Sequence, residues 1–136
     1  MASSRGDLTV TKPRTKTNMI AEVTETFTFE AAHRIEDSRP EYGQIHGHSH
    51  TVLVTVEGEV STPQGWLIEQ THFRKLAGFH IKRLDHRYLN EKLENTTAEG
   101  IAGHLLSVIG RSDFPPGIKV KSVEVRKTTT RAKVSI

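Results

Sequence analysis

Cysteine is absent from the 136 residues of this sequence. Its absence excludes disulfide bonds, thiolate metal ligands and a thiol nucleophile. No apolar stretch is long enough to span a bilayer, and the first residues lack the apolar segment of a secretory signal. We therefore expect a cytoplasmic protein without a membrane partner. The length fits a single domain with a modest core.

Most of the chain carries no net charge. The formal net charge is +3, and the first 17 residues carry it, with four basic side chains and one acidic side chain. The remaining residues are balanced, with 15 basic and 15 acidic groups. We expect residues 1–17 to form a disordered basic tail and residues 18–136 to form one domain. A neutral domain gives no support to nucleic acid as a partner.

Alternating apolar and polar residues predict four β-strands. The first two cover residues 19–33 and 46–60 and are joined by a loop over residues 34–45. The last two cover residues 118–127 and 131–136. Because long strands at a sheet edge leave backbone groups unpaired, we expect edge-to-edge assembly into a symmetric homo-oligomer.

Two helices are predicted between these pairs of strands. Apolar residues at helical spacing run from Phe73 to Leu84. The second helix begins at a capping box, in which Thr96 caps the helix and Glu99 reaches back, and it ends at Gly110. The order β-β-α-α-β-β predicts an α+β domain, a four-stranded antiparallel sheet with two helices on one face.

The second predicted strand opens with His46-Gly47-His48. Side chains alternate along a strand, so His46 and His48 point the same way. His33 ends the preceding strand, and if the two strands pair, three imidazoles converge. Three nitrogen ligands with an open fourth position are typical of catalytic zinc. The alternative is that these are surface or core histidines that bind no metal.

The other histidines are weaker candidates. His50 continues the face of His48, and it either extends the polar face or supports His48 from behind. His72, His80 and His104 fall on the predicted helices, where we expect structural or solvated roles.

Five motifs resemble, in order and spacing, those of the 6-pyruvoyltetrahydropterin synthase / 6-carboxytetrahydropterin synthase family: Phe29-Glu30-Ala31-Ala32-His33-Arg34, His46-Gly47-His48-Ser49, Gly65-Trp66-Leu67-Ile68-Glu69, Leu84-Asp85-His86-Arg87-Tyr88-Leu89-Asn90 and Thr96-Thr97-Ala98-Glu99. The resemblance covers roughly residues 20–130. It implies a tunnelling fold (T-fold) whose subunits assemble into stacked rings, here a hexamer or a tetramer.

The resemblance also implies a zinc-dependent lyase that acts on 7,8-dihydroneopterin triphosphate or a related heterocycle. Its zinc ligands map onto the three histidines of the first two strands. A family aspartate–histidine pair, which works with a cysteine in proton transfer, maps onto Asp85 and His86. On the residues alone, Asp85 indicates a turn cap and His86 a solvated side chain. With the resemblance, His86 becomes the general acid or base and Asp85 the group that orients it.

The family cysteine is replaced here. Four residues before the first histidine of the His-Gly-His motif stands Tyr42, and a phenol ionises at higher pH than a thiol. Tyr42 either donates a proton or packs, and Glu41 beside it is an alternative source of a carboxylate. Some family members use a glutamate in place of the cysteine and cleave the side chain to give a hydroxymethyl pterin.

The family carboxylate that grips the pterin is replaced too. In the strand pattern Val-x-Val-x-Glu-Thr, Lys127 stands where the glutamate is expected, followed by Thr128. We expect Lys127, Thr128 and Glu99 to contact the substrate. Because an ammonium group has donors only, it cannot accept from the donor edge of a pterin. The exchange predicts a ligand that presents acceptors or negative charge to Lys127.

Three functions therefore stay open. The first is a zinc-dependent lyase of the synthase type, and the second is cleavage of the pterin side chain without a cysteine. The third is a zinc-containing homologue that binds a ligand and has lost the chemistry.

Overall fold

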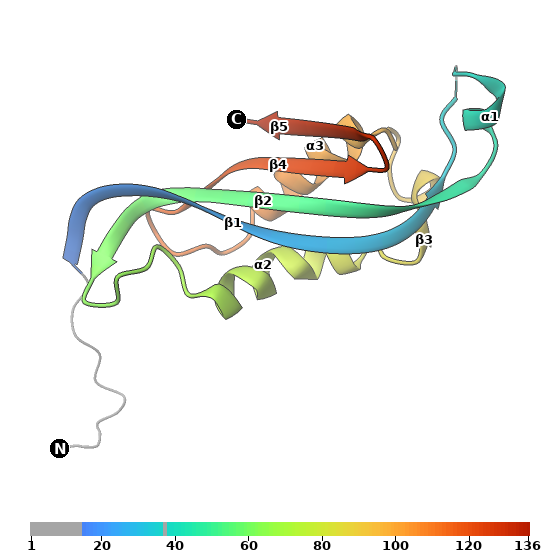
Figure 1. The fold of residues 1–136 in the computed structure, drawn as a ribbon. Coiled ribbons are helices and arrows are strands. Elements are labelled where there is room, and N and C mark those ends of the chain that lie inside the picture. Colours follow the sequence, from blue (N-terminus) through green and yellow to red (C-terminus); the bar gives the residue numbers. More distant parts are fainter. Residues whose placement is uncertain (1–14, 37) are drawn as a thin grey trace.

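The structure is a computed structural model that describes residues 15–36 and 38–136. Its elements are, in chain order, β1 (Thr15–His33), α1 (Pro40–Gly43), β2 (His46–Thr62), α2 (Gln70–Lys82), β3 (Arg87–Tyr88), the 3₁₀ turn η1 (Leu89–Glu91), α3 (Ala98–Gly110), β4 (Lys119–Lys127) and β5 (Thr130–Ser135). Figure 1 shows the long β1–β2 pair running the length of the molecule, with α2 and α3 packed along the sheet.

The strands form one sheet in the order β3-β1-β2-β4-β5. The four predicted strands are confirmed as β1, β2, β4 and β5, and these pair antiparallel. The prediction of a purely four-stranded antiparallel sheet is wrong in one respect, since β3 adds a fifth strand parallel to β1. With two residues, β3 is too short for an alternating pattern to reveal it.

The core lies on one face of the sheet. On β2 the even-numbered side chains Val52, Val54 and Val56 are fully buried, as their alternation predicts. The helices cover this face, as predicted, with Phe73 of α2 and Ile101 of α3 among the fully buried side chains. The even-numbered side chains of β2 therefore face the core. The histidines at the start of β2 are also even-numbered, so they point to the same side of the sheet.

The first strand begins earlier than predicted. β1 starts at Thr15, so residues 15–17 of the predicted tail are strand, paired with the end of β2. Residues 1–14 of that tail lie outside the described residues. The register of β1 shifts between Lys16 and Ile20, and Met19 in this interval is 59% exposed.

Both long helices begin at a side-chain cap. Glu69 caps α2, because its carboxylate accepts the backbone N–H groups of Thr71 and His72. The cap of α3 is Thr97 and not Thr96, since Thr97 Oγ1 accepts the N–H of Gly100 at 3.1 Å. The cap therefore lies one residue later than predicted, and the predicted capping box is wrong, because Gly100 at the third helical position has no side chain to reach back.

The segment between β1 and β2 is not only a loop. Pro40 begins the short helix α1, a position that a proline ring tolerates because the first turn needs no N–H donor.

In the part of the chain that the structure describes, no helix has the length and apolar character needed to cross a membrane.

Candidate metal centre and active-site cavity

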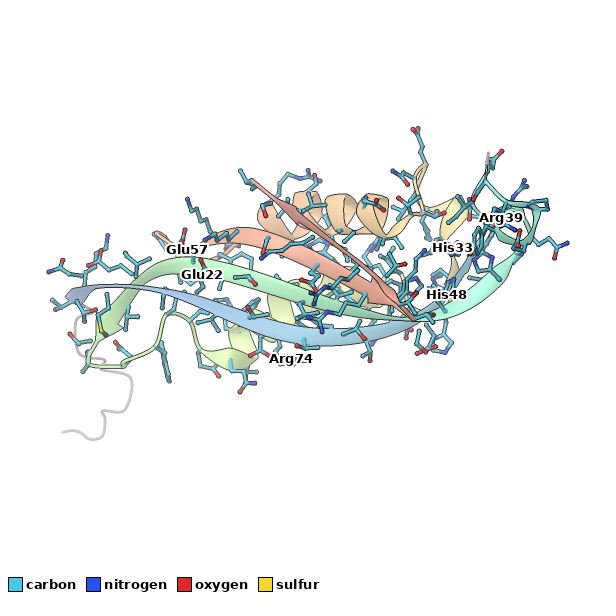
Figure 2. All side chains as sticks on the ribbon, turned by 45° about the horizontal axis from the view of Figure 1, so that its top comes forward. Glu22, His33, Arg39, His48, Glu57 and Arg74 are labelled. Carbon is cyan, nitrogen blue, oxygen red and sulfur yellow. The ribbon has the colours of Figure 1, made fainter. Side chains whose placement is uncertain are left out.

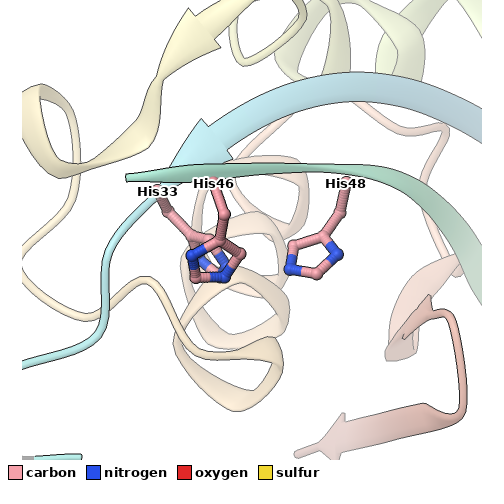
Figure 3. A group of neighbouring side chains, drawn as sticks. All are labelled: His33, His46 and His48. Carbon is pink, nitrogen blue, oxygen red and sulfur yellow. The ribbon is translucent and has the colours of Figure 1, made fainter. Parts of the chain in front are cut away.

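Three histidines meet at one end of the β1–β2 pair. His33 is the last residue of β1 and lies opposite His46, the first residue of β2, in the strand register. His48 follows on the same side of β2, and Figure 3 shows its ring beside those of the other two. The ring nitrogens that the three side chains offer lie within 4.8 Å of one another. The predicted convergence of three imidazoles is therefore present.

The hydrogen bonds of two of these rings fix which nitrogen is free. Nδ1 of His33 lies 2.8 Å from the carbonyl oxygen of Thr96, and Nδ1 of His46 lies 2.8 Å from that of Gln44. A carbonyl oxygen only accepts, so both Nδ1 atoms carry the proton and both Nε2 atoms keep a lone pair. This carbonyl-to-imidazole arrangement is typical of histidines that bind metal through Nε2.

Burial favours the neutral form of two of these imidazoles. It lowers the pKa of His33 to about 4 and also lowers the pKa of His48, and in both cases the charge of Lys127 adds to the effect. Nε2 of His33 is buried and has no hydrogen-bond partner among the described residues. A buried lone pair without a partner is costly, and a neutral imidazole is the form that binds metal. The residues present therefore fit a divalent metal such as zinc.

His50 lies behind this cluster. Its ring is fully buried and stacks on Phe29, with 4.5 Å between ring centroids and 6° between planes. Neither ring nitrogen has a hydrogen-bond partner within residues 15–36 and 38–136. Of the two predicted roles, extension of the polar face is therefore observed, whereas the hydrogen bond needed to support His48 is not formed.

A cavity of about 560 Å³ opens in front of the cluster. We call it the histidine cavity, and it is lined by Ile35, Ser38, Tyr42, His46, His48, Thr97, Ala98, Glu99, Lys127, Thr128, Thr129 and Thr130. Four residues that sequence reasoning placed in the site thus meet two of the metal-binding candidates here: Tyr42, Glu99, Lys127 and Thr128. Figure 2 shows His33 and His48 at the end of the sheet that carries this cavity.

Tyr42 and Glu41 are placed differently. Tyr42 lines the histidine cavity, with its ring centroid 6.3 Å from that of His46, and it is 47% exposed. The carboxylate of Glu41 lies 3.3 Å from the guanidinium of Arg39, and Glu41 is not among the lining residues. Of the two candidates for the missing cysteine's position, Tyr42 is therefore the one that faces the cavity.

Lys127 and Glu99 put opposite charges into the histidine cavity. Burial lowers the pKa of the half-buried Lys127, and the Glu99 carboxylate counteracts this shift. Within the described ranges, no carboxylate oxygen lies within 4.0 Å of the Lys127 amine. The ammonium group is thus available to a ligand.

Asp85 and His86 are in direct contact, which their adjacency in the sequence did not guarantee. A carboxylate oxygen of Asp85 lies 2.9 Å from Nδ1 of His86, and the other accepts the backbone N–H of Glu30 at 2.8 Å. The contact depends on the left-handed conformation of His86, whose φ is 59°. The N–H of Glu30 and the His86 imidazole hold the pKa of Asp85 below its usual value.

The Asp85–His86 pair faces a different cavity. This second cavity is lined by Glu30, Ala31, Ala32, Gly47, His48, Ser49, His86, Arg87 and Tyr88. Glu30 and Ser49 have the opposite strand parity from the metal-binding candidates, so the cavity lies across the sheet. Among the described residues, only His48 lines both cavities. Within one chain, His86 therefore does not meet Tyr42 or Lys127.

Several site features were missed by sequence reasoning. The carbonyl groups of Gln44 and Thr96 carry no sequence signal, because every residue has one. Ser38, Thr129 and Thr130 also line the histidine cavity. The two threonines follow Lys127 in the turn between the last two predicted strands, and that position was the available signal for them.

A sheet covered by two helices on one face, with three converging imidazoles at one end, defines a T-fold protein with a candidate metal centre. Residues 22–135 match the family model described as 6-pyruvoyl tetrahydropterin synthase. The chain belongs to this family, as its motifs indicated.

Similar sequences carry more than one activity name. The chain is 33% identical over 98 residues to a dihydroneopterin monophosphate aldolase from Pyrococcus furiosus, a match that covers 72% of this chain and 82% of the relative. It is 31% identical over 116 residues to a 6-carboxy-5,6,7,8-tetrahydropterin synthase from Synechocystis, covering 78% of this chain and 85% of that protein. Both names are those of pterin-processing enzymes.

Solved structures share the fold. The 6-pyruvoyl tetrahydropterin synthase of Caenorhabditis elegans superposes with a TM-score of 0.75 at 20% identity, covering 87% of this chain and 96% of that one. A variant of the Plasmodium vivax synthase, in which a glutamate described as catalytic is replaced by alanine, superposes with a TM-score of 0.62 at 17% identity and covers 88% of this chain. The predicted T-fold is therefore confirmed.

Proposed function

We propose that this chain is a zinc-dependent lyase that cleaves the side chain of a phosphorylated 7,8-dihydroneopterin without a cysteine. The observation that carries the proposal is the histidine cavity, which joins metal-competent imidazoles to Tyr42 and Lys127 in a chain that has no thiol. The relative named dihydroneopterin monophosphate aldolase supports this choice among the pterin-processing activities of the family.

His33, His46 and His48 would hold the zinc, the first two through Nε2. When bound, zinc supplies a Lewis acid for hydroxyl groups of the substrate side chain and lowers the pKa of these groups. The protein's own contribution is to favour the neutral form of His33 and His48 by burial and to orient His33 and His46 through the carbonyl groups of Thr96 and Gln44.

The cleavage needs one proton to leave and one to arrive. The 2′-hydroxyl loses its proton, the C1′–C2′ bond breaks, and its electron pair passes through C1′ into the ring. A proton then arrives at C1′, which leaves a hydroxymethyl dihydropterin and a two-carbon aldehyde that carries the phosphate. No oxidant is needed. Tyr42 faces the cavity and is the residue that we assign to proton donation.

His86 enters this scheme only through a second copy of the chain. Within one chain it lies across the sheet from Tyr42, so the Asp85–His86 pair can serve a histidine cavity only if another subunit presents it there. The edge strand β5 and the exposed Met19 and Ile20 of β1 are surfaces for such assembly. We therefore propose a homo-oligomer, with stacked rings as the expected form. We also propose a cytoplasmic location.

A synthase that acts on 7,8-dihydroneopterin triphosphate is the second candidate. It is supported by the Synechocystis relative, whose identity to this chain is close to that of the aldolase. Both candidates share the metal centre and differ in the bond that breaks, so product analysis separates them.

The test is incubation of the zinc-loaded protein with 7,8-dihydroneopterin monophosphate and, separately, with the triphosphate, with products identified by mass. A hydroxymethyl dihydropterin is the expected product. A pyruvoyl or carboxy tetrahydropterin would instead establish the synthase. Unchanged substrates with one zinc per chain would contradict both and leave a ligand-binding homologue. Protein stripped of metal by a chelator and a His48→Ala variant are the controls for metal dependence.

A further inference from the structure

The turn between β4 and β5 forms one wall of the histidine cavity. Lys127, the last residue of β4, pairs with Thr130, the first residue of β5, and Thr128 and Thr129 form the turn between them. All four line the cavity. Figure 1 shows this turn at the same end of the molecule as β3 and α1.

The backbone of the turn is unusual. Thr128 has a φ of 43°, in the left-handed region that β-branched residues rarely adopt. Such conformations concentrate at ligand sites, where the surrounding structure holds them. Within the described residues, the backbone N–H groups of Thr128 and Thr129 donate no hydrogen bond to the main chain. Consecutive free N–H groups in a turn form a concave donor surface that suits an anion.

The charge of the wall points the same way. Lys127 lines the same cavity as His46 and His48, so its ammonium group lies on the metal-binding side of the sheet. Neutral imidazoles leave both charges of a bound divalent cation uncompensated. Glu99 is the single carboxylate among the described lining residues. The metal-loaded cavity therefore has an excess of positive charge, and a dianionic group balances it.

We propose that the β4–β5 turn is the phosphate subsite of this enzyme, with the Lys127 ammonium, the hydroxyl groups of Thr128 to Thr130 and the N–H groups of Thr128 and Thr129 donating to a phosphate monoester. The identity of the substrate rests on the function proposed above, but the chemistry of the subsite does not. Lys127 has donors only, so it suits phosphate oxygens and not the donor edge of a pterin. Glu99, on the same cavity, supplies the acceptor that this donor edge requires.

The first test compares two substrates, 7,8-dihydroneopterin monophosphate and 7,8-dihydroneopterin, in the zinc-loaded protein. We expect the wild type to prefer the phosphate ester in kcat/KM by about 10- to 100-fold, the range expected for loss of a charged hydrogen bond. Lys127→Met should abolish this preference, and Lys127→Arg should keep most of it. Lys133→Met removes an exposed charge from the same hairpin, outside the cavity, and should leave the preference unchanged. Equal losses for both substrates in Lys127→Met would overturn the assignment.

The second test measures binding without catalysis. Inorganic phosphate is titrated into metal-free protein and followed by calorimetry, with circular dichroism to establish that each variant is folded. We expect binding by the wild type and by Lys133→Met, and at least about tenfold weaker binding by Lys127→Met. Absence of binding, or equal binding by wild type and Lys127→Met, overturns the subsite.

The two tests separate this inference from the proposed function. If no pterin is cleaved and phosphate binding still depends on Lys127, the proposed function fails and the subsite stands. If the protein cleaves dihydroneopterin and its phosphate ester with equal kcat/KM, and the Lys127→Met variant behaves like the wild type, the proposed function stands and the subsite fails.

Discussion

Nδ1 of His33 donates a hydrogen bond to the carbonyl oxygen of Thr96, and the two atoms are 2.8 Å apart. The hydroxyl of Thr96 in turn donates to the carbonyl oxygen of Arg34 at 3.1 Å. The end of β1 is therefore tied to the residue before the cap of α3. A change at the start of α3 should be felt at the metal centre, although no metal ligand comes from that helix.

Gly100 offers a direct way to test this coupling. A Cβ at Gly100 would lie 2.3 Å from the backbone oxygen of Asn95, so the segment that carries Thr96 must shift in Gly100→Ala. We expect a loss of about 1–3 kcal/mol in the free energy of unfolding and weaker zinc binding. Urea denaturation and a zinc titration measure the two effects.

Gly103→Ala is the matched control, because a Cβ at Gly103 meets nothing within 4 Å in the middle of the same helix. It should raise stability by about 0.5–1 kcal/mol, through the higher helix propensity of alanine, and leave zinc binding unchanged. Wild-type stability in Gly100→Ala would show that the contact with Asn95 is not tight.

Removal of one of the three imidazoles should lower the bound zinc to less than one ion per chain. His48→Ala leaves two ligands for the ion, so zinc measured by mass spectrometry after dialysis should fall well below one per chain. His72→Ala removes an exposed histidine at the start of α2 and should retain full metal content. Equal zinc in both variants would place the metal elsewhere.

His50→Phe should stabilise the metal-free protein, most strongly in acid. Burial lowers the pKa of His50 to about 4 from 6.5, so the unfolded chain takes up this proton at higher pH than the folded one. The contribution of His50 to stability is therefore present above pH 6.5 and is lost as the pH falls toward 4. Phenylalanine keeps the stacking on Phe29 and removes two unpartnered nitrogens, for a gain of about 1–3 kcal/mol.

Thermal unfolding of wild type and His50→Phe at about pH 8 and about pH 5 measures this effect. The difference between the two proteins should be larger at the lower pH, while His33, whose pKa is lowered to a similar value, keeps part of the acid sensitivity in both. A variant that loses stability more steeply in acid than the wild type would contradict the assignment.

His86→Gln should lower turnover strongly while zinc content and oligomeric state stay as in the wild type. The reason is that His86 lies away from the metal cluster, paired with Asp85 in the second cavity. Full activity in the variant would remove His86 from proton transfer.

Mixing His86→Gln with His48→Ala tests whether subunits share a site. If one subunit supplies the histidine cavity and another supplies His86, oligomers assembled from both inactive variants regain part of the activity after joint refolding. Mixtures that stay inactive although mixed oligomers form would contradict a shared site.

Lys127→Glu should reverse the charge preference of the histidine cavity. A carboxylate at this position repels a phosphate and removes the ammonium donor. Calorimetry should show weaker binding of the phosphate ester, whereas unphosphorylated dihydroneopterin, whose donor edge is assigned to Glu99, should bind about as it does to the wild type. No change for either ligand would show that residue 127 makes no contact with them.

The sequence predicted the parts of the site that follow from strand periodicity. His46 and His48 were placed on the face of Val52 because side chains alternate, and the structure confirms this. The cap of α3 could not be chosen in the same way, because two adjacent threonines both fit the pattern. A contact distant in sequence decided it, since Thr96 is used by His33 and Arg34 and Thr97 is left to cap.

The Asp85–His86 contact was beyond sequence reasoning for a backbone reason. It requires the left-handed φ of His86, which residues other than glycine seldom adopt and which no local pattern announces. The position of the pair across the sheet depends on β3, a two-residue strand set by its pairing with β1. Long-range contacts, and not propensity, determine both.

The metal centre and the substrate wall of the histidine cavity are built on different strands. The imidazoles come from β1 and β2, whereas Lys127 and the threonines come from the β4–β5 turn. Mutational drift in the turn can therefore change which molecule is accepted while the ion and its reactivity are inherited intact. One scaffold can in this way diversify through a four-residue segment, in which this chain carries a lysine and three threonines.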